Sequence, residues 1–328
     1  MIEKRLLNKT KIRKLFRDEY SLNAKNIELV SSGSAEIYKI DNEYILKLFQ
    51  SKYTKKEILK EVKVINYLKK KNIPVPTYVK TNKNDYVVKI ENRFLIVQYY
   101  IDGKTKDKFE GTIDEIKECG YLHGLIVKSL LGYKNVQIDK MDWYNKKENI
   151  AKIKKIIKMG NNKLIKEDLN KKISMIENLN YDFKDIDKIT FYTSHGDFSY
   201  LQFIYDNDGV KAIIDFIKVK KLPIVWEIIR SFTYMDKDAK NGIINVDNLV
   251  LYVKEFMKLV PLSKTDLEYM PYIYVCQLLR STFGYKEYYL NKNKEALQFA
   301  HFRTNLCEYL YKNAEMISKK LGELVWRI

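Results

Sequence analysis

Two acidic residues stand beside strand-like apolar runs in the second half of the sequence. Asp197 lies in the stretch SHGDFSYLQF, where His195 and Gly196 precede it and Gln202 follows five residues later. Asp215 lies in AIIDFIKVKK, at the end of a short apolar run. A carboxylate in such a place can accept a proton from a substrate hydroxyl or bind a divalent cation through its oxygens. The pattern therefore indicates acid–base or metal chemistry, with a loop-capping carboxylate as the plain alternative for Asp197.

A lysine and a glutamate nearer the N-terminus are further candidates for chemistry. Lys47 lies between two apolar neighbours on one face of a predicted strand, where a lysine is rarely found without a partner. Glu61 lies at the edge of the apolar stripe of the next predicted helix. Glu57, on the same predicted helix, belongs to a T-x-x-E capping box. The alternative for Lys47 is a lysine on an edge strand that extends its charge into water.

The elements expected to position these residues change in character along the chain. The pattern predicts a short amphipathic helix within residues 1–20 and three antiparallel strands over 27–49. A helix follows and ends at the prolines of NIPVP. DYVVKIENRFLIVQYYIDG then predicts a hairpin with a turn near Glu91–Asn92, whose second strand finishes at Asp102–Gly103. From about residue 112 the periodicity is helical, apart from a strand-like interlude at 189–216. We therefore expect an α+β fold with a small antiparallel sheet lobe and a large, mainly helical lobe.

Composition narrows the class of protein. A chain of 328 residues with 46% apolar residues can fold as one large or two medium domains. It contains no run of about 18 apolar residues, and its charged start lacks the apolar core of a secretory signal. The three cysteines are scattered, which argues against a disulfide framework or a zinc site and favours a reducing compartment. We therefore expect a cytoplasmic protein without a membrane partner.

The formal net charge of +18 raises the question of nucleic acid. The lysines, however, are spread along the whole chain and alternate with apolar residues at helical spacing, as on solvated helix faces. No RNA-binding aromatic motif, zinc finger or basic zipper accompanies them. We do not expect nucleic acid to be the main partner.

Four segments occur in an order that resembles a known family: ILK, E…YLKKKNIPVP, HGDFSYLQ and IIDF. They are similar to the motifs of the aminoglycoside phosphotransferase and choline kinase-like family, which has a protein-kinase-like two-lobed fold. The resemblance covers most of the chain, from about residue 27 to 235. It implies an N-terminal nucleotide-binding lobe over residues 1–101 and a C-terminal catalytic and substrate-binding helical lobe over 102–328. It also implies transfer of the γ-phosphate of ATP or GTP, with Mg²⁺, to a hydroxyl of a small molecule.

The same resemblance implies a role for each candidate. Asp197 would be the catalytic base, and Asp215 with Gln202 would bind Mg²⁺, although most relatives carry Asn where this chain has Gln202. Lys47 would contact the α/β-phosphates, with Glu61 as its partner; Glu57 is the rival for that role, but the capping box already uses its side chain. The other residues expected to bind the nucleotide are the first hairpin, Ser32, Gly33 and Ser34, and the hinge, Gln98, Tyr99, Tyr100 and Ile101. His195 would brace the catalytic loop, since no Ser or Cys nucleophile pattern accompanies it.

The segment after IIDF departs from the family. Lys218, Lys220 and Lys221 stand where many relatives have small and acidic residues, and Glu227 stands where an aspartate is common. The lysines are either solvated turn residues or groups that attract an anionic substrate. Because aminoglycosides are polycations and the C-terminal third has no acidic concentration, an antibiotic acceptor is disfavoured but stays open beside an amino alcohol, a sugar or an amino acid. Aromatic and basic residues that could line an acceptor pocket, but are more often core, are Trp226, Arg230, Tyr234, Arg280 and Tyr285.

The main alternative is a non-catalytic, kinase-like binding or structural protein, for example of the spore-coat type. Lys47, Asp197 and Asp215 favour the enzyme, whereas Gln202 and the glycine-poor first hairpin favour the alternative. The expected partners of the enzyme are a nucleoside triphosphate and a small hydroxylated substrate, and we expect a monomer or a homodimer.

Overall fold

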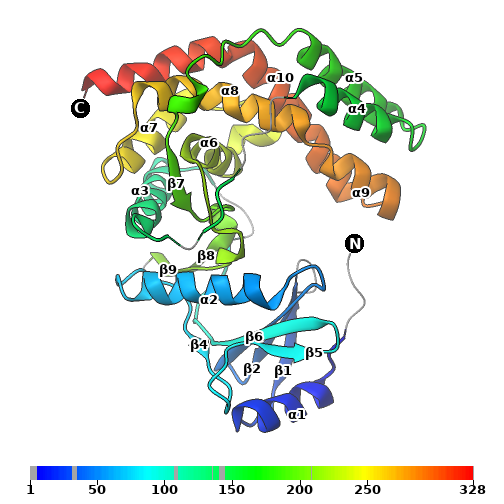
Figure 1. Cartoon of the computed structure of the whole chain (residues 1–328), viewed down its shortest axis with the longest axis vertical. Coiled ribbons are helices and arrows are strands. Elements are labelled where there is room, and N and C mark those ends of the chain that lie inside the picture. The colour runs from blue at the N-terminus through cyan, green and yellow to red at the C-terminus, as the bar shows by residue number, and fades with distance from the viewer. Residues whose placement is uncertain are drawn as a thin grey trace. The chain divides into compact units, whose positions relative to one another are not determined.

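A computed structural model of the chain describes residues 6–31, 35–106, 110–134, 136–139, 145–207 and 209–327. They form two compact units (Figure 1). The first combines Met1–Lys106 with Leu201–Val219, and the second combines Asp107–Tyr200 with Lys220–Ile328. A boundary after residue 101, as the sequence predicts, would place Leu201–Val219 in the C-terminal lobe. This segment belongs to the first unit because its backbone bonds to it: Ile213 N donates to Pro74 O at 2.9 Å.

The first unit is built on an antiparallel sheet. Its elements are α1 (Lys9–Tyr20), β1 (Ile27–Ser31), β2 (Ala35–Ile40), β3 (Tyr44–Phe49), α2 (Lys55–Lys69), β4 (Tyr78–Val79), β5 (Val88–Ile90), β6 (Arg93–Tyr99), β8 (Phe203–Asp206) and β9 (Gly209–Ile213). The sheet order is β1-β2-β3-β6-β4, with β5 also paired to β6. Strands β8 and β9 form a separate hairpin. The three predicted strands over 27–49 and the helix after them are confirmed.

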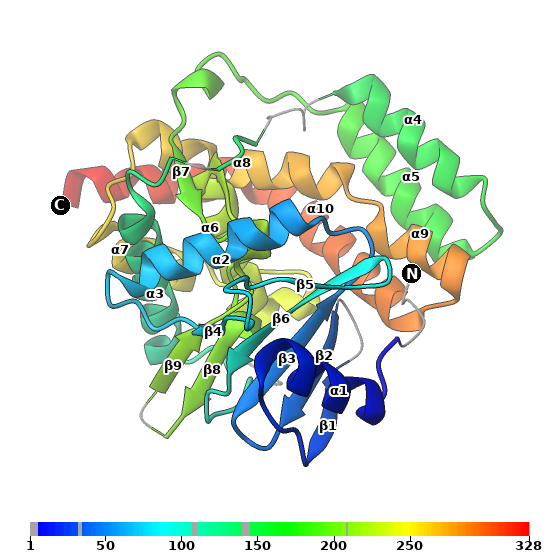
Figure 2. The same ribbon diagram turned by 60° about the horizontal axis from the view of Figure 1, so that its bottom comes forward.

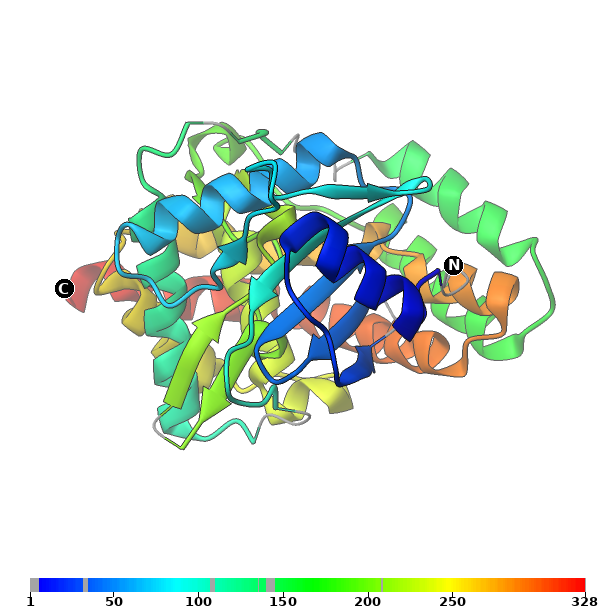
Figure 3. The same cartoon turned by 90° about the horizontal axis from the view of Figure 1, so that it is seen from below.

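Alternation along β3 sends neighbouring side chains to opposite faces of this sheet. Leu46 and Leu48 are fully buried in a core that includes Ile12 and Phe16 of α1. Helix α1 therefore covers one face, as the view from below shows (Figure 3), while α2 lies on the other (Figure 1). Lys47 lies between Leu46 and Leu48, so its side chain points to the opposite face of the sheet, toward α2.

Local signals explain where these elements begin and end. Thr54 and Glu57 form the predicted capping box at the start of α2. The turn between β5 and β6 is at Glu91, whose φ of 54° closes the tight connection. Strand β6 ends at Tyr99, earlier than the predicted Asp102–Gly103, because the Tyr100 N–H leaves the ladder to bond with Glu43 O at 2.7 Å.

The second unit is mainly helical. Its elements are α3 (Ile113–Leu130), α4 (Lys146–Ile157), α5 (Lys163–Glu177), β7 (Phe191–Ser194), β10 (Lys220–Pro223), α6 (Ile224–Met235), α7 (Val246–Met257), α8 (Lys264–Arg280), α9 (Phe283–Asn291) and α10 (Lys294–Gly322). Helix α8 packs along α10, α3 packs against α7, and α4 and α5 lie side by side (Figure 2). Strands β7 and β10 pair antiparallel just before α6. Within the described residues, no helix is long and apolar enough to cross a membrane.

Candidate active site

Three residues that lie far apart in the sequence meet in the first unit. The Lys47 ammonium lies 2.6 Å from Asp215 Oδ1 and 3.6 Å from Glu61 Oε1. Strand β3 supplies the lysine, α2 supplies the glutamate, and the segment after β9 supplies the aspartate. The contact rules out a Lys47 side chain that extends freely into water, and it selects Glu61 rather than Glu57, which serves the helix cap.

Burial and the neighbouring charges shift the pKa values of Glu61 and Lys47. Glu61 is only 2% exposed, and its Oε1 accepts a hydrogen bond from the Tyr78 hydroxyl at 3.1 Å. Burial raises the pKa of Glu61, and the Lys47 charge offsets that rise only in part. Burial alone would lower the pKa of Lys47, but Glu61 and Asp215 together raise it. The lysine is therefore held as a cation between two carboxylates.

The β8–β9 hairpin places Gln202 and Asp215 on its open end. Gln202 O accepts a 2.9 Å hydrogen bond from the N–H of Ile214, the residue before Asp215. Asp215 itself has a left-handed backbone, with φ 66° and ψ 54°, which is uncommon for a residue with a side chain and often marks a functional position. A short 3-10 helix, Phe216–Lys218, follows and packs against α2, which brings the aspartate to Glu61.

The backbone near Gly103 fixes this hairpin to the rest of the unit. Lys104 and Tyr205 exchange two backbone hydrogen bonds of 2.8 and 2.9 Å. A Cβ on Gly103 would lie 2.6 Å from Tyr205 O, so the approach needs a residue without a side chain.

The Gln202 amide oxygen and the Asp215 carboxylate fit a divalent cation of the hard type. Mg²⁺ usually takes one or two carboxylates from the protein and completes its shell with water and substrate phosphates. The described residues contain no group of three or more His, Cys, Asp or Glu side chains that could hold a metal ion. The two predicted ligands thus fit an ion that arrives with a nucleotide.

The predicted catalytic loop lies in the second unit, directly after β7. Gly196 has a φ of 81°, a left-handed conformation that glycine adopts without strain. The next turn is held by Glu227 of α6, whose Oε1 accepts the N–H of Phe198 at 3.1 Å. His195 is fully buried, with its ring edge-on to Phe198 at 6.0 Å, as a bracing residue requires.

Glu227 is itself fixed by a histidine from α3. Its Oε2 lies 3.4 Å from His123 Nε2, and the His123 ring stacks on Phe198 at 4.4 Å. Burial would raise the pKa of Glu227, but its contact with His123 outweighs that effect and lowers the pKa to about 2. Glu227 therefore supports the loop as a carboxylate. From the sequence alone, it was only a glutamate at a position where the family commonly has an aspartate.

Arg230 of α6 is the residue that the sequence-based site omitted. Its Nη2 donates to Asp197 Oδ1 in an ion pair in which both side chains are mostly buried. The two residues are 33 positions apart, and nothing in the local sequence distinguishes Arg230 from a core arginine. The Asp197 carboxylate therefore faces a cation.

The predicted hinge lies at the end of β6. Tyr99 N donates to Thr77 O at 2.9 Å, so the Tyr99 and Tyr100 N–H groups both have backbone partners. The Tyr99 side chain is half exposed and packs on Tyr44, with ring centroids 5.6 Å apart. Gln98 lies within β6, and Ile101 follows the strand. Ser32, Gly33 and Ser34 lie outside the described residues.

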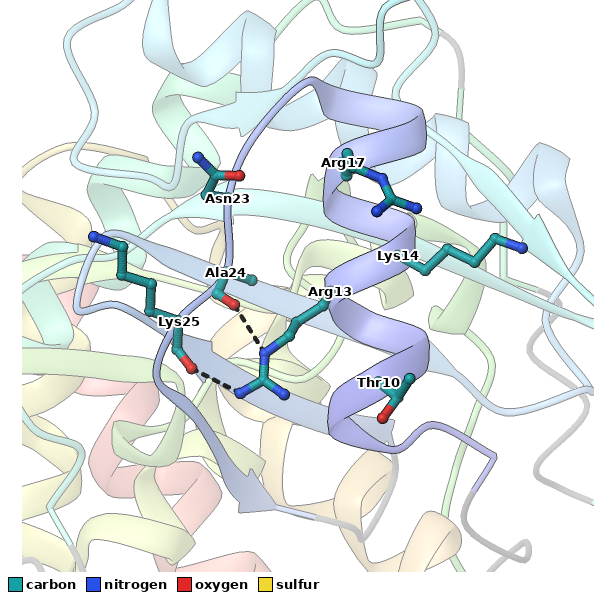
Figure 4. Close-up of a pocket in the computed structure, with 7 residues that line it drawn as sticks. All are labelled: Thr10, Arg13, Lys14, Arg17, Asn23, Ala24 and Lys25. Atoms are coloured by element: carbon teal, nitrogen blue, oxygen red, sulfur yellow. Dashed lines mark hydrogen bonds between the residues drawn. The ribbon is translucent and has the colours of Figure 1, made fainter.

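A separate hollow of about 540 Å³ runs along α1 and is lined by basic side chains (Figure 4). Arg13 uses its guanidinium there to bind the carbonyls of Ala24 and Lys25, at 3.2 and 3.1 Å. This arginine ties the segment before β1 to α1. None of the predicted site residues lines the hollow, so it is not part of the candidate active site.

Solved structures of other proteins share the fold of this chain. No protein-family model and no curated protein sequence match the chain. Its structure nevertheless matches kinases of small molecules over nearly its whole length. The chain has the protein-kinase-like fold of the aminoglycoside phosphotransferases, which confirms the predicted α+β fold and resemblance.

Three of these solved structures show how closely the chain matches known proteins. A spectinomycin phosphotransferase in complex with ADP and spectinomycin has a TM-score of 0.62 at 14% identity, covering 97% of this chain and 100% of that one. An amicoumacin kinase has a TM-score of 0.61 at 15% identity, covering 94% of each chain. A microcompartment-associated aminopropanol kinase has a TM-score of 0.62 at 13% identity, covering 95% of this chain and 99% of that one.

Proposed function

We propose that the protein is a small-molecule O-phosphotransferase that moves the γ-phosphate of ATP or GTP to a substrate hydroxyl. The observation that carries the proposal is the position of Lys47 between Glu61 and Asp215, which three separate elements of the first unit bring together. A cation held at this point can bind phosphate oxygens, and Glu61 keeps it in place. Structures with the same fold that contain ADP, AMP-PNP or GDP support a nucleotide as the phosphate donor.

Asp215 and Gln202 would hold Mg²⁺, which neutralises phosphate charge and orients the γ-phosphate for transfer. Gln202 supplies an amide oxygen and Asp215 a carboxylate oxygen, both at the open end of the β8–β9 hairpin. Lys47 then contacts the phosphates while it remains beside Asp215. These residues bind and orient the donor, and the base edge would lie along Gln98–Ile101.

Asp197 would accept the proton of the acceptor hydroxyl, or orient that hydroxyl toward the phosphate. The carboxylate is held by Arg230 and by a loop that Glu227 and His195 brace. Arg230 also keeps a positive charge beside Asp197, where a phosphoryl group carries negative charge during transfer. The loop thereby gives the base a fixed position and a charge-matched neighbour.

The first test measures nucleotide binding. Titration calorimetry of ATP and GTP into the full chain, with and without Mg²⁺, should show metal-dependent binding of at least one nucleotide. Asp215→Asn should abolish the metal dependence. Asp206→Asn is the matched control, because Asp206 lies on the same hairpin but pairs with Lys211. Absence of binding by both nucleotides would contradict the proposal and leave the non-catalytic, kinase-like alternative.

The second test separates binding from catalysis. Asp197→Asn should keep nucleotide affinity while it lowers acceptor-dependent phosphate transfer by about 10²–10⁴-fold, the usual contribution of a positioned base. Asp139→Asn is the control in the second unit, since Asp139 pairs with Lys220 and lies outside the loop. Full activity of the Asp197 variant would refute its role as the base.

A further inference from the structure

The second unit contains a small pocket whose charged side chains are all cations. Its volume is about 170 Å³, below the roughly 300–1,000 Å³ of most drug-sized sites. The residues that line it are Lys172 of α5, Arg230 and Tyr234 of α6, Gln277 and Ser281 at the end of α8, Phe283 and Gly284 of α9, and Phe299, Ala300 and Arg303 of α10. No Asp or Glu is among these lining residues. The pocket therefore has three positive charges and space for a small ligand.

Two of the three cations have no carboxylate partner among the described residues. Lys172 is 2% exposed, and two of its three N–H groups donate to the carbonyls of Leu278 and Ser281, at 2.9 and 2.8 Å. Arg303 is also buried and donates to the Tyr274 hydroxyl and to Gln277 Oε1, both at 3.1 Å. Buried cations normally lie beside an opposite charge. Here neutral acceptors take that place in direct contact, and Asp168 acts on Lys172 without forming an ion pair with it.

Arg230 links this pocket to the predicted base. Its Nη2 pairs with Asp197, while its Nη1 is buried without a hydrogen-bond partner in the described part of the chain. A guanidinium has five N–H donors in a flat fork that suits a carboxylate or a phosphate. Arg230 thus pairs with the predicted base and also lines the pocket, which connects the two.

Aromatic rings hold both guanidinium groups in place. Tyr234 and Phe299 stack with centroids 6.3 Å apart, and the Arg303 guanidinium lies 5.5 Å from the Phe299 ring. The Arg230 guanidinium lies 4.8 Å from the Tyr234 ring. Cation–π contacts of this kind fix an arginine without neutralising it. The site is thereby organised before any ligand arrives.

We propose that this pocket binds an anionic group, a carboxylate or a phosphate ester, on the acceptor molecule. The inference rests on the proposed function, and it specifies the acceptor as a small hydroxyl compound with a negative charge. A polycation such as an aminoglycoside would place its ammonium groups among three positive side chains. An anion, in contrast, would supply the partner that Lys172 and Arg303 lack, and it would hold the neighbouring hydroxyl near Asp197 through Arg230.

The nearby charges agree with this assignment. Asp168 is close to Lys172 but does not line the pocket, because the Tyr285 hydroxyl and His301 Nδ1 hold its Oδ2 at 2.8 Å each. The three lysines that the sequence suggested as an anion site, Lys218, Lys220 and Lys221, do not line this pocket. Lys220 pairs with Asp139, and Lys218 and Lys221 are exposed.

The test uses four compounds that differ only in the group beside the same diol. Glycerate carries a carboxylate, glycerol 3-phosphate a phosphate, glycerol a hydroxyl and 3-amino-1,2-propanediol an ammonium group. Binding to the full chain is measured by calorimetry or saturation-transfer NMR at constant ionic strength, with and without Mg²⁺ and AMP-PNP. At least one of the two anions should bind about tenfold or more tightly than the ammonium compound, as expected for charge-assisted hydrogen bonds.

One variant lowers the positive charge of the pocket by one and preserves its shape. Gln277→Glu puts a carboxylate on the residue that already accepts from Arg303, so the hydrogen bond remains and the net charge falls. It should reduce anion affinity about tenfold and leave the thermal stability of the second unit undiminished. Gln298→Glu makes the same change in charge at an exposed position of α10 and should leave anion binding unchanged.

Each outcome has a defined meaning. Equal or tighter binding of the ammonium compound, or binding of none of the four, would overturn the inference. An anion that competes with AMP-PNP would also overturn it, because the cations would then serve the nucleotide phosphates. Failure of nucleotide binding concerns the proposed kinase function instead, since anion binding is measured without nucleotide as well. Glycerate and glycerol 3-phosphate distinguish the two kinds of anionic group.

Discussion

Substitution of Lys47 by Met should destabilise the first unit more than any change at the protein surface. The substitution leaves Glu61 buried without its cation, 3.6 Å from where the ammonium was. At an effective dielectric constant of about 20, that attraction corresponds to about 4.6 kcal/mol. Removal of one partner from a buried ion pair typically costs about 3–5 kcal/mol. We expect the free energy of unfolding of this unit to fall by about 3–5 kcal/mol.

A second substitution should recover most of that loss. Glu61→Gln removes the stranded charge and keeps an oxygen that can accept from the Tyr78 hydroxyl. The double variant should therefore regain most of the stability lost in Lys47→Met, because the two changes act on one interaction. The cost of Lys47→Met should also shrink at acid pH. Burial already raises the pKa of Glu61 above its ordinary 4.5, and loss of Lys47 raises it further. As the pH falls toward this raised pKa, Glu61 becomes protonated and no longer needs a cation beside it.

The assay must report on the first unit alone. No tryptophan falls within Met1–Lys106 or Leu201–Val219, so tryptophan fluorescence does not report directly on this unit. Native-state hydrogen exchange of peptides from β3 and α2 gives the free energy of opening there. Fluorescence of the second unit serves as an internal control and should not change. Lys63→Met, an exposed lysine of α2, should cost less than about 0.5 kcal/mol.

A loss below about 1 kcal/mol for Lys47→Met would refute the reasoning. Such a value is typical of a solvated ion pair and would mean that Glu61 does not depend on the lysine. A double variant as unstable as the single one would refute it in another way, because the lost energy would then come from packing of the lysine stem.

Three further predictions concern the second unit. Gly196→Ala should lower its stability by about 1–2 kcal/mol in thermal unfolding, because alanine is strained at a φ of 81°. Glu227→Gln should weaken the dependence of the free energy of unfolding on pH. The pKa of Glu227 is about 2 in the folded protein and 4.5 ordinarily, so its carboxylate stabilises the fold above pH 4.5. This contribution, on the order of 3 kcal/mol, is lost as the pH falls toward 2. Glycerate affinity should fall from pH 7 to 9 in calorimetry, since burial lowers the pKa of Lys172 to about 8; the groups that act on it are Cys307, Arg303, Asp168 and Lys152.

Much of the fold could be predicted because its elements carry local signals. The capping box at Thr54 and Glu57 and the turn at Glu91 occur where the sequence places them. Strands β4 and β10 were not predicted. A strand of two residues such as β4 has no periodicity to detect, and β10 lies within a lysine-rich segment whose pairing with β7 depends on residues that are distant in the chain.

The residues of the candidate site also differ in whether the local sequence could identify them. Lys47 could be selected because a lysine between apolar neighbours needs a partner, and the structure supplies two. Arg230 could not be selected, since its contact with Asp197 joins residues on a loop and a helix that only the tertiary structure brings together. The three-cation pocket has the same origin, because its lining comes from α5, α6, α8, α9 and α10.

The interrupted course of the chain through the first unit has a consequence for biosynthesis. Asp215 and the β8–β9 hairpin leave the ribosome only after Asp107–Tyr200, a segment of the other unit. At about 5–20 residues per second, the intervening roughly 90 residues delay them by on the order of 5–20 seconds. During that interval the nascent sheet has Lys47 and Glu61 but not their third partner. The N-terminal unit is therefore the first to begin folding and cannot be complete until two thirds of the protein has been made.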